Sequence, residues 1–293
     1  IMATTAPKYL CPAMNTEMYN NPITQRNLEG LRSLGYHIMD PAEGWLACGI
    51  TGVGRLPEPE AIVDWLEAKM CSTNELEGTT ILVTAGGTQE SIDPVRYIGN
   101  RSSGKMGYAI AEQAARMGAK VILVSAPTSL PIPNSVDFIS VDSAVSMQEA
   151  VEARYNDVNV VIMAAAVSDF RVLHKAEQKI KKMESMTIEL VKNPDILQGL
   201  GSKKSHQILV GFAAETEHVI KYGQDKVAKK NLDMLVANDV SKSNAGFNVD
   251  TNEGYFLYPD KEPKEMPNMK KSDLARHILR EVIDLVANKA DIN

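Results

Sequence analysis

A glycine- and serine-rich stretch with one lysine holds the residue types that most clearly could do chemistry. It runs from Gly99 to Gly107 and reads Gly-Asn-Arg-Ser-Ser-Gly-Lys-Met-Gly. It nearly matches the phosphate loop G-x-x-x-x-G-K-[ST], but Met106 stands where a magnesium-binding hydroxyl would be. An amphipathic helix predicted over 108–117 follows directly. Because helix N-termini favour anions, the stretch predicts phosphate or carboxylate binding by something other than a P-loop NTPase.

Other polar groups lie on the connection between this stretch and the apolar strand predicted over 80–84. Gly86 and Gly87 come directly after the strand, where glycine lets a backbone approach a phosphate, although an ordinary tight turn would look the same. Arg96 could clamp a phosphate with two hydrogen bonds, and Asn100 could polarise an acyl carbonyl. A solvated polar loop is the alternative, yet loops this long inside a compact domain are usually functional.

A second group of candidates follows the longest apolar run, 158–163. Ala164, Ala165 and Ala166 leave room for a flat ring or a backbone contact at the end of this strand, although alanines are as often simple packing. Asp169 then comes at the carboxyl edge of the sheet, where it could contact a nucleotide or a metal-bound phosphate. Phe212, after another apolar run, could stack on a base, although core phenylalanines are commoner.

Lysines concentrate in the second half of an otherwise acidic chain. The cluster from Lys179 to Lys182 precedes an alternating stretch, so that on a strand-like segment Lys179 and Lys181 share one face. Lys226 and Lys230 are four residues apart on one helix face. Without further context a solvated lysine cluster is the default interpretation of each group.

Strand–helix alternation begins at Thr79. Apolar runs without alternation predict strands buried on both faces, hence a doubly wound, mostly parallel Rossmann-like α/β sheet. These runs are 80–84, 121–124, 158–163, 208–210 and 234–236. The stretch 255–258 predicts an added antiparallel strand, and Ser272 is predicted to cap a final helix over 272–288. Asn193 and Pro194 are predicted as the N-cap and first residue of a helix that Asp195 opens.

The N-terminal part has a different pattern. It predicts short strands at 9–11 and 37–39, a helix over 23–34, a loop over 41–59 and a helix over 60–69. The polar stretch 71–78 is predicted to be a linker, which divides the chain into domains at 1–70 and 79–293. Because Ile1 is not an initiator, we expect residues 1–70 to be the end of a domain that begins upstream.

Composition excludes some classes of partner. The net charge of −6 argues against nucleic acid as the main partner, and no apolar run approaches the length of a membrane span. The three cysteines, Cys11, Cys48 and Cys71, have no zinc-site spacing, and without a signal peptide they indicate reduced thiols in the cytoplasm.

Several specific motifs together resemble one known family over essentially the whole chain. The segments 81–88 and 102–107 resemble the ligase half of the bifunctional coenzyme A biosynthesis flavoproteins, which pair phosphopantothenate–cysteine ligase with phosphopantothenoylcysteine decarboxylase. Five later motifs extend the resemblance: Ala164-Ala-Ala-Val-Ser-Asp169, Lys179-Ile-Lys-Lys182, Val191-Lys-Asn-Pro194, Val210-Gly-Phe-Ala-Ala-Glu-Thr216 and Ala237-Asn-Asp239.

The resemblance implies a CTP-dependent, magnesium-assisted ligation of 4′-phosphopantothenate to cysteine through an acyl-cytidylate. It implies that Asn100 acts on this intermediate, that Arg96 belongs to the same site, and that Lys179 stabilises charge on the α-phosphate. The implied substrate contacts are Gly86, Gly87, Ser102, Ser103 and Lys105 in the ligase half and Asn15 in the decarboxylase half. The implied CTP contacts are Met163, Ala164, Ala165, Asp169, Lys179, Val191, Lys192, Asn193, Pro194, Phe212, Lys226 and Lys230. Asp169 would also hold the metal.

Two segments of the N-terminal part resemble the decarboxylase half, which implies a partial flavodoxin-like domain. Pro12-Ala-Met-Asn15 resembles its substrate-binding motif, and 47–59 resembles a clamp whose cysteine, Cys48, would be the proton donor. The full-length decarboxylase half would use FMN. Because its phosphate loop and histidine are expected upstream of Ile1, we expect this chain to be colourless and unable to decarboxylate. The resemblance also implies a homodimer through the ligase domain, and a higher oligomer if the flavin domain is complete.

Two other classes of function stay open. A Rossmann-type NAD(P) oxidoreductase is disfavoured because the fingerprint G-x-G-x-x-G is missing. A non-catalytic regulatory subunit is disfavoured because Asn100, Asp169 and Lys179 are all present.

Overall fold

The computed structural model describes residues 3–70, 73–182, 184–215, 217–239 and 251–290. The chain divides into two compact units, Ile1–Ser72 and Thr73–Asn293. Cys71, the first part of the predicted linker and Thr216 lie outside the described residues.

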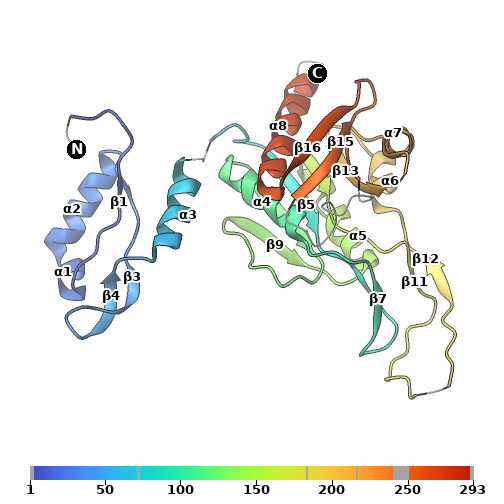
Figure 1. The fold of residues 1–293 in the computed structure, drawn as a ribbon, viewed down its shortest axis with the longest axis horizontal. Helices are drawn as coiled ribbons and strands as arrows, with labels where there is room; N and C mark the ends of the chain where they lie inside the picture. The colour runs from blue at the N-terminus through green and yellow to red at the C-terminus, as the bar shows by residue number, and fades with distance from the viewer. Residues whose placement is uncertain (1–2, 71–72, 183, 216, 240–250, 291–293) are drawn as a thin grey trace. The chain divides into compact units, whose positions relative to one another are not determined.

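An eight-stranded sheet forms the centre of the larger unit, in the order β16-β15-β14-β13-β10-β5-β8-β9 (Figure 1). The strands from β14 to β9 in this order run parallel, and β15 and β16 are added antiparallel. This confirms the predicted α/β class and the antiparallel strand around 255–258. The parallel strands are β5 (Thr80–Ala85), β8 (Lys120–Ser125), β9 (Val136–Ser140), β10 (Val160–Met163), β13 (Ile208–Glu215) and β14 (Met234–Asp239), and the antiparallel ones are β15 (Thr251–Leu257) and β16 (Lys264–Lys270).

Helices cover both faces of this sheet, because alternate side chains of each strand enter separate hydrophobic clusters. Ile81 packs in the cluster that contains the helices α4 and α8, whereas its neighbour Leu82 packs in the cluster on the other face. Both side chains are fully buried, which is why the strand shows no polar alternation. The helices are α4 (Lys105–Arg116) and α8 (Lys271–Ala290) on one face, and α5 (Ala144–Glu152), α6 (Ile196–Ser202) and α7 (Val219–Lys229) on the other.

The order of the strands reverses between β5 and β10, which are neighbours at the centre of the sheet. From β5 the chain proceeds outward through β8 and β9, and from β10 it proceeds the other way through β13 and β14. The two strand ends are joined: Ala166 N donates to Gly86 O at 2.8 Å, and Thr88 N donates to Ala166 O at 3.2 Å. Gly86 has φ +78°, and a Cβ there would come within 2.6 Å of Ala126 O, so glycine is required.

Two antiparallel hairpins interrupt the alternation of strands and helices. The first pairs β6 (Gln89–Ser91) with β7 (Tyr97–Gly99), and the second pairs β11 (Phe170–Val172) with β12 (Leu190–Lys192). In Figure 1 both project from the same end of the sheet. The prediction that 179–182 is strand-like is wrong, because the second hairpin has only three residues on each side and 179–182 is an irregular part of its loop.

The smaller unit has a two-stranded parallel sheet of β1 (Tyr9–Leu10) and β2 (His37–Ile38). Between these strands lie α1 (Thr16–Asn20) and α2 (Pro22–Ser33), and α3 (Pro59–Met70) ends the unit. The N-cap of α2 is Asn21, whose side chain accepts from Ile23 N at 2.9 Å, with proline at the first helical position. The predicted loop over 41–59 is partly wrong: it contains the antiparallel pair β3 (Ala42–Trp45) and β4 (Thr51–Arg55).

Two predicted helix caps are also wrong. The N-cap of α6 is Asp195, which accepts from Gln198 N at 3.0 Å, so Asn193 and Pro194 lie before the helix. The buried Asn193 side chain instead donates to Ser168 O at 2.8 Å. The final helix α8 begins at Lys271, so Ser272 lies inside its first turn.

Candidate active site

A cavity of about 350 Å³ lies beyond the carboxyl ends of the central strands, where the strand order reverses. This is the position at which open α/β sheets bind their ligands. Its walls come from four places in the chain: the loop and first turn of α4, the end of β10, the end of β13, and the C-terminal elements. The lining residues are Asn100, Ser102–Gly107, Ala164–Val167, Asp169, Phe212–Ala214, Lys226, Asn238, Asn252 and Lys271.

The predicted glycine- and serine-rich stretch forms one wall of this cavity. Gly104 is the N-cap of α4 and has φ +75°, so no side chain occupies the helix N-terminus. A Cβ at Gly107 would come within 2.7 Å of Thr84 O, which lets the first turn of α4 lie against β5. Gly104 N donates to Ser102 Oγ at 3.3 Å. The geometry is that of an open helix N-terminus facing a cavity, as the sequence predicted.

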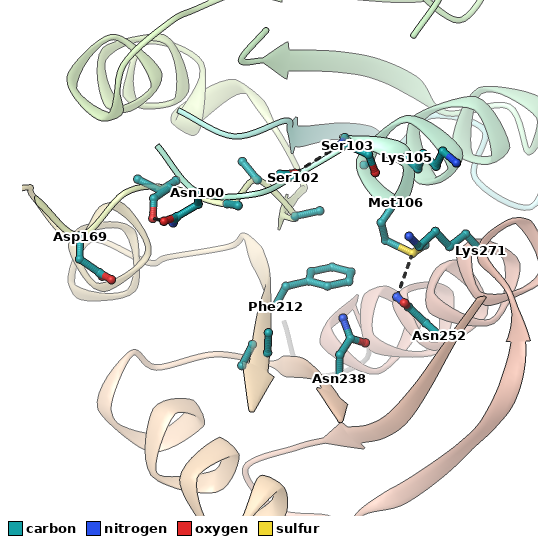
Figure 2. Close-up of a pocket in the computed structure, with 18 of the residues that line it drawn as sticks. Asn100, Ser102, Ser103, Lys105, Met106, Asp169, Phe212, Asn238, Asn252 and Lys271 are labelled. Atoms are coloured by element: carbon teal, nitrogen blue, oxygen red, sulfur yellow. Dashed lines mark hydrogen bonds between the residues drawn. The ribbon is translucent and has the colours of Figure 1, made fainter. Parts of the chain in front are cut away.

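Asn100 and Asp169 lie at one end of the cavity, and the C-terminal residues lie at the other. Figure 2 shows Phe212 between them, with Met106, Asn252 and Lys271 at the far end. Asn100 is held in place because its Nδ2 donates to Val167 O at 3.0 Å. Lys271, at the start of α8, has only 8% of its surface exposed, which is unusual for a lysine.

A second cavity of about 290 Å³ shares Ala165, Val167, Asp169 and Phe212 with the first. We refer to the two together as the cleft. The second lobe is also lined by Met163, Ser168, Lys192–Leu197 and Lys230. Most of the predicted nucleotide contacts therefore gather in this lobe, and three of the predicted substrate contacts, Ser102, Ser103 and Lys105, line the first.

The cleft is rich in lysine although the chain is acidic overall. Lys105, Lys226 and Lys271 line the first lobe, and Lys192 and Lys230 line the second, against the carboxylates of Asp169 and Asp195. Lys230 Nζ lies 2.9 Å from Asp195 Oδ2. Burial opposes the charge on Asp195, but Lys230, the Gln198 N–H and Lys192 outweigh it and lower its pKa. This lining favours an anionic ligand.

Two buried polar atoms in the cleft walls have no hydrogen-bond partner in the part of the chain that the structure describes. They are Asn238 Oδ1 in the first lobe and Ser168 Oγ in the second. Because an unpaired buried polar atom is costly, such atoms in a cavity wall are suited to a ligand that supplies the missing partner.

Other predicted site residues lie outside the cleft lining. Gly86 and Gly87 form the turn behind it, and Val191 is in β12. Arg96 lies on the β6–β7 turn, where its side chain binds Asp93 rather than lining the cleft. Lys179 is exposed on the loop of the second hairpin and lines neither lobe. The sequence did not predict Ser168, Asn252 or Lys271, and a Lys-Lys pair before a helix carries no signal of burial.

The predicted residues of the smaller unit come together. Asn15 Nδ2 donates to Cys48 Sγ at 3.2 Å, and both line a cavity of about 410 Å³ with the Met14 and Trp45 side chains. Cys48 is exposed.

Family models and known proteins match nearly all of the chain. A model described as the C-terminal domain of DNA/pantothenate metabolism flavoproteins matches residues 76–286, and a flavoprotein model matches residues 1–71. The coenzyme A biosynthesis bifunctional protein CoaBC of Bacillus subtilis is 47% identical over 97% of this chain and 71% of its own length. The chain belongs to this family of bifunctional coenzyme A biosynthesis flavoproteins. The CoaBC protein of Escherichia coli K12 is 46% identical over 96% of the chain and 70% of its own length.

Solved structures agree with this assignment. The crystal structure of the C-terminal domain of a CoaBC protein is 44% identical, covers 74% of this chain and all of that domain, and has a TM-score of 0.64. A Cab2 mutant in complex with phosphopantothenate-cysteine is 18% identical with a TM-score of 0.57, a likeness of fold. Because the chain belongs to this family, it is an enzyme of coenzyme A biosynthesis. No helix among the described residues is long and apolar enough to cross a membrane.

Proposed function

We propose that residues 73–293 ligate 4′-phosphopantothenate to cysteine at the expense of CTP, through an acyl-cytidylate. The observation that carries the proposal is the two-lobed, lysine-lined cleft at the switch point of the sheet. Its first lobe suits an acyl substrate with an anionic end, and its second lobe suits a nucleotide. The two lobes share Asp169 and Phe212, so ligands in them would meet at this wall.

The reaction has two bond exchanges. In the first, a carboxylate oxygen of phosphopantothenate attacks the α-phosphorus of CTP, and the bond to the β-phosphate oxygen breaks to release pyrophosphate. In the second, the cysteine amine attacks the acyl carbon and CMP leaves with the former carboxylate oxygen. Activation is needed because a free carboxylate is a poor acyl donor. CTP rather than another nucleotide follows from the family resemblance alone.

The residues of the cleft support roles in both steps. Asn100 lines the first lobe, is bound to Val167 O in the wall that the two lobes share, and could donate its second amide hydrogen to the acyl oxygen on which charge develops. Lys271 and the N-terminus of α4 would bind an anionic end of the acyl substrate. Lys179 would stabilise charge on the α-phosphate, which requires its side chain to reach from the loop to a nucleotide bound in the second lobe.

A magnesium ion would neutralise the triphosphate of CTP. One carboxylate together with substrate phosphates is a common magnesium site, and Asp169, which lines both lobes, fits this role. Among the described residues there is no cluster of three or more histidine, cysteine or acidic side chains that would hold a metal by itself.

Pyrophosphate release with each nucleotide in turn tests the proposal. We expect release with CTP and magnesium only when phosphopantothenate is present, and phosphopantothenoylcysteine as the product after cysteine is added. Omission of each substrate is the control. If no nucleotide tested gave pyrophosphate release, a regulatory subunit would be supported instead. Reduction of a nicotinamide by the same protein would support an oxidoreductase.

The contact between Asn15 and Cys48 supports a second candidate function for the longer protein. It is the decarboxylation of phosphopantothenoylcysteine, with Cys48 as the proton donor and FMN as the redox cofactor. The described residues of the smaller unit do not fit the flavin phosphate. At the connection from β1 to α1, the Asn15 side chain already accepts from Glu17 N, and Glu17 places a negative charge in the first turn. We therefore derive no flavin step for this chain.

The proposal also includes a homodimer through the ligase domain, a higher oligomer in the presence of a complete flavin domain, and a cytoplasmic location. Sedimentation of the purified chain tests the first of these. A monomer that retains full ligase activity would contradict it.

A further inference from the structure

A buried carboxylate lies at the turn of the first hairpin, outside the cleft. Asp93 has 2% of its surface exposed. Its Oδ1 accepts from the backbone N–H groups of Val95 and Arg96, both at 2.8 Å. These two bonds close the turn between β6 and β7 and are local to the hairpin.

The other oxygen of Asp93 reaches a segment far away in the sequence. Asp93 Oδ2 accepts from Arg96 Nε at 3.1 Å and from Ile180 N at 3.2 Å. Arg96 Nη2 lies 2.8 Å from the same oxygen and also donates to Ile180 O at 2.7 Å. The pair of side chains therefore binds both the N–H and the C=O of Ile180, which is the neighbour of Lys179. We refer to Asp93, Arg96 and Ile180 as the clamp.

Charge makes the clamp persistent at neutral pH. Burial opposes ionisation of Asp93, but the N–H groups of Val95, Ile180 and Arg96 and the charge of Arg96 outweigh it, and the pKa is lowered to about 2. Hydrogen bonds to a charged acceptor are about twice as strong as neutral ones. A third hydrogen bond, from Ala176 N to Ile92 O at 2.9 Å, joins the same two segments four residues before Ile180.

The first hairpin is itself fixed to the body of the domain. Gln89 N donates to Asp142 O at 2.7 Å, and the buried Glu90 accepts from Ala144 N, in the first turn of α5, at 2.9 Å. After β7 the same hairpin leads directly to Asn100 at the wall of the cleft. The hairpin therefore connects a fixed base, the cleft and the Lys179 loop.

We propose that Asp93 is a positioning residue that, through Arg96 and Ile180, holds the loop of Lys179 within reach of the nucleotide. The proposal rests on the ligase function proposed above. It assigns Arg96 to the clamp, because its guanidinium is engaged with Asp93 and Ile180 O. Asp93 itself does not touch the cleft, so its effect on the reaction must pass through Lys179.

The variant Asp93→Asn should break the clamp while it leaves the hairpin turn intact. The amide oxygen can still accept from Val95 and Arg96, which preserves the turn, but an NH2 group facing Ile180 N–H and Arg96 places donors against donors. Ile180→Pro is a second variant in the loop itself, which removes the Ile180 N–H and leaves the Asp93–Arg96 pair. Glu112→Gln is the matched control, since it removes one carboxylate from an ion pair with Arg116 on the surface of α4.

A double-mutant cycle measures whether Asp93 acts through Lys179. For CTP-dependent pyrophosphate release, we expect Asp93→Asn to lower kcat about a hundredfold while KM for phosphopantothenate stays the same, since a misplaced catalytic group commonly costs this much. In a Lys179→Gln background, Asp93→Asn should cause no further loss. An equal loss in both backgrounds would overturn the proposal.

Limited trypsin digestion tests the clamp independently of activity. Lys181 and Lys182 are exposed and follow Ile180 directly, so we expect faster cleavage there in Asp93→Asn and Ile180→Pro than in the wild type or Glu112→Gln. Equal cleavage rates in all four proteins would show that the clamp does not hold the loop. If the wild type instead released no pyrophosphate, the ligase proposal would fail while the cleavage result still decided the clamp.

Discussion

The two units of this chain differ in how their predicted site residues are supported. In the larger unit, the cleft is built on the ends of central strands whose side chains are buried on both faces. In the smaller unit, Asn15 at the start of α1 meets Cys48 in the turn between β3 and β4, and Leu28 and Leu46 are its only buried hydrophobic residues among those described. The difference teaches that a contact between site residues is not yet a site: the core behind it determines whether the geometry persists.

The largest expected effect comes from separating the units. Residues 73–293, expressed alone, should unfold cooperatively in urea and retain the ligase activity, because both hydrophobic clusters lie within them. Residues 1–72 alone should show no cooperative transition by circular dichroism. Absence of product from a folded, monodisperse 73–293 fragment would contradict the ligase assignment.

The second largest effect distinguishes two positions in the larger unit, the fixed Asn100 and the loop residue Lys179. Lys179→Gln should slow formation of the acyl-cytidylate so that little of it is trapped, whereas Asn100→Asp should allow it to form and then accumulate. Loss of one transition-state contact costs about 2.7–4 kcal/mol, or roughly a hundred- to a thousandfold in rate. Trapping with radiolabelled CTP measures this. Equal labelling of both variants would refute the assigned roles.

A smaller effect tests the closed end of the cleft. Lys271→Met should raise KM for phosphopantothenate about tenfold or more and leave KM for CTP unchanged, because a hydrogen bond to a charged group is worth about 1.5–3 kcal/mol. Lys221→Met, on the exposed side of α7, is the control. An equal rise in both Michaelis constants would show that Lys271 serves the fold and not one substrate.

The pH dependence of the clamp should be confined to acid. The pKa of Asp93 is lower in the folded chain, about 2, than its usual value of 3.8, so its stabilising charge is present above about pH 4 and is lost as the pH falls through about 2. Amide exchange at Ile180, corrected for intrinsic rates, should therefore accelerate between pH 4 and pH 2. In Asp93→Asn this acceleration should vanish, and its persistence would assign the change to another group.

The smallest effect concerns the smaller unit. Cys48 is exposed and Cys11 is partly buried, so iodoacetamide should label Cys48 before Cys11 in the native chain. Peptide mass spectrometry of the early product measures the order. Preferential labelling of Cys11 would indicate that the cavity around Cys48 is closed in solution.

The sequence predicted the centre of the sheet well for a physical reason. Strands such as β5 and β8 are buried on both faces, so their apolar runs are unbroken, and parallel strand ends must meet at one edge. It failed where tertiary contacts decide. In β4, Gly54 lies so close to Met14 O that no Cβ would fit. Part of the glycine-rich stretch 41–59, which was predicted to be a loop, is therefore a packed strand.

Local rules also failed where a side chain has a better distant partner. Asn193 is a good N-cap by residue type, but its amide donates to Ser168 O and accepts from Arg171. Asp195 caps the helix instead. Arg96 was predicted to clamp a phosphate, but its side chain binds Asp93, three residues away, and Ile180. The contact with Ile180 could not be inferred because the two residues are 84 positions apart in the sequence.

The outer strand β16 has a consequence for how copies of the chain behave when concentrated. An edge strand offers unpaired backbone groups to any passing strand, and this is a common start of aggregation. In β16, Pro267 has no N–H to offer, the register with β15 is irregular opposite it, and lysines stand at both ends of the strand. These features disfavour strand pairing between the β16 edges of two copies. We therefore expect the protein to stay in solution at concentrations at which proteins with flat, uncharged edge strands aggregate.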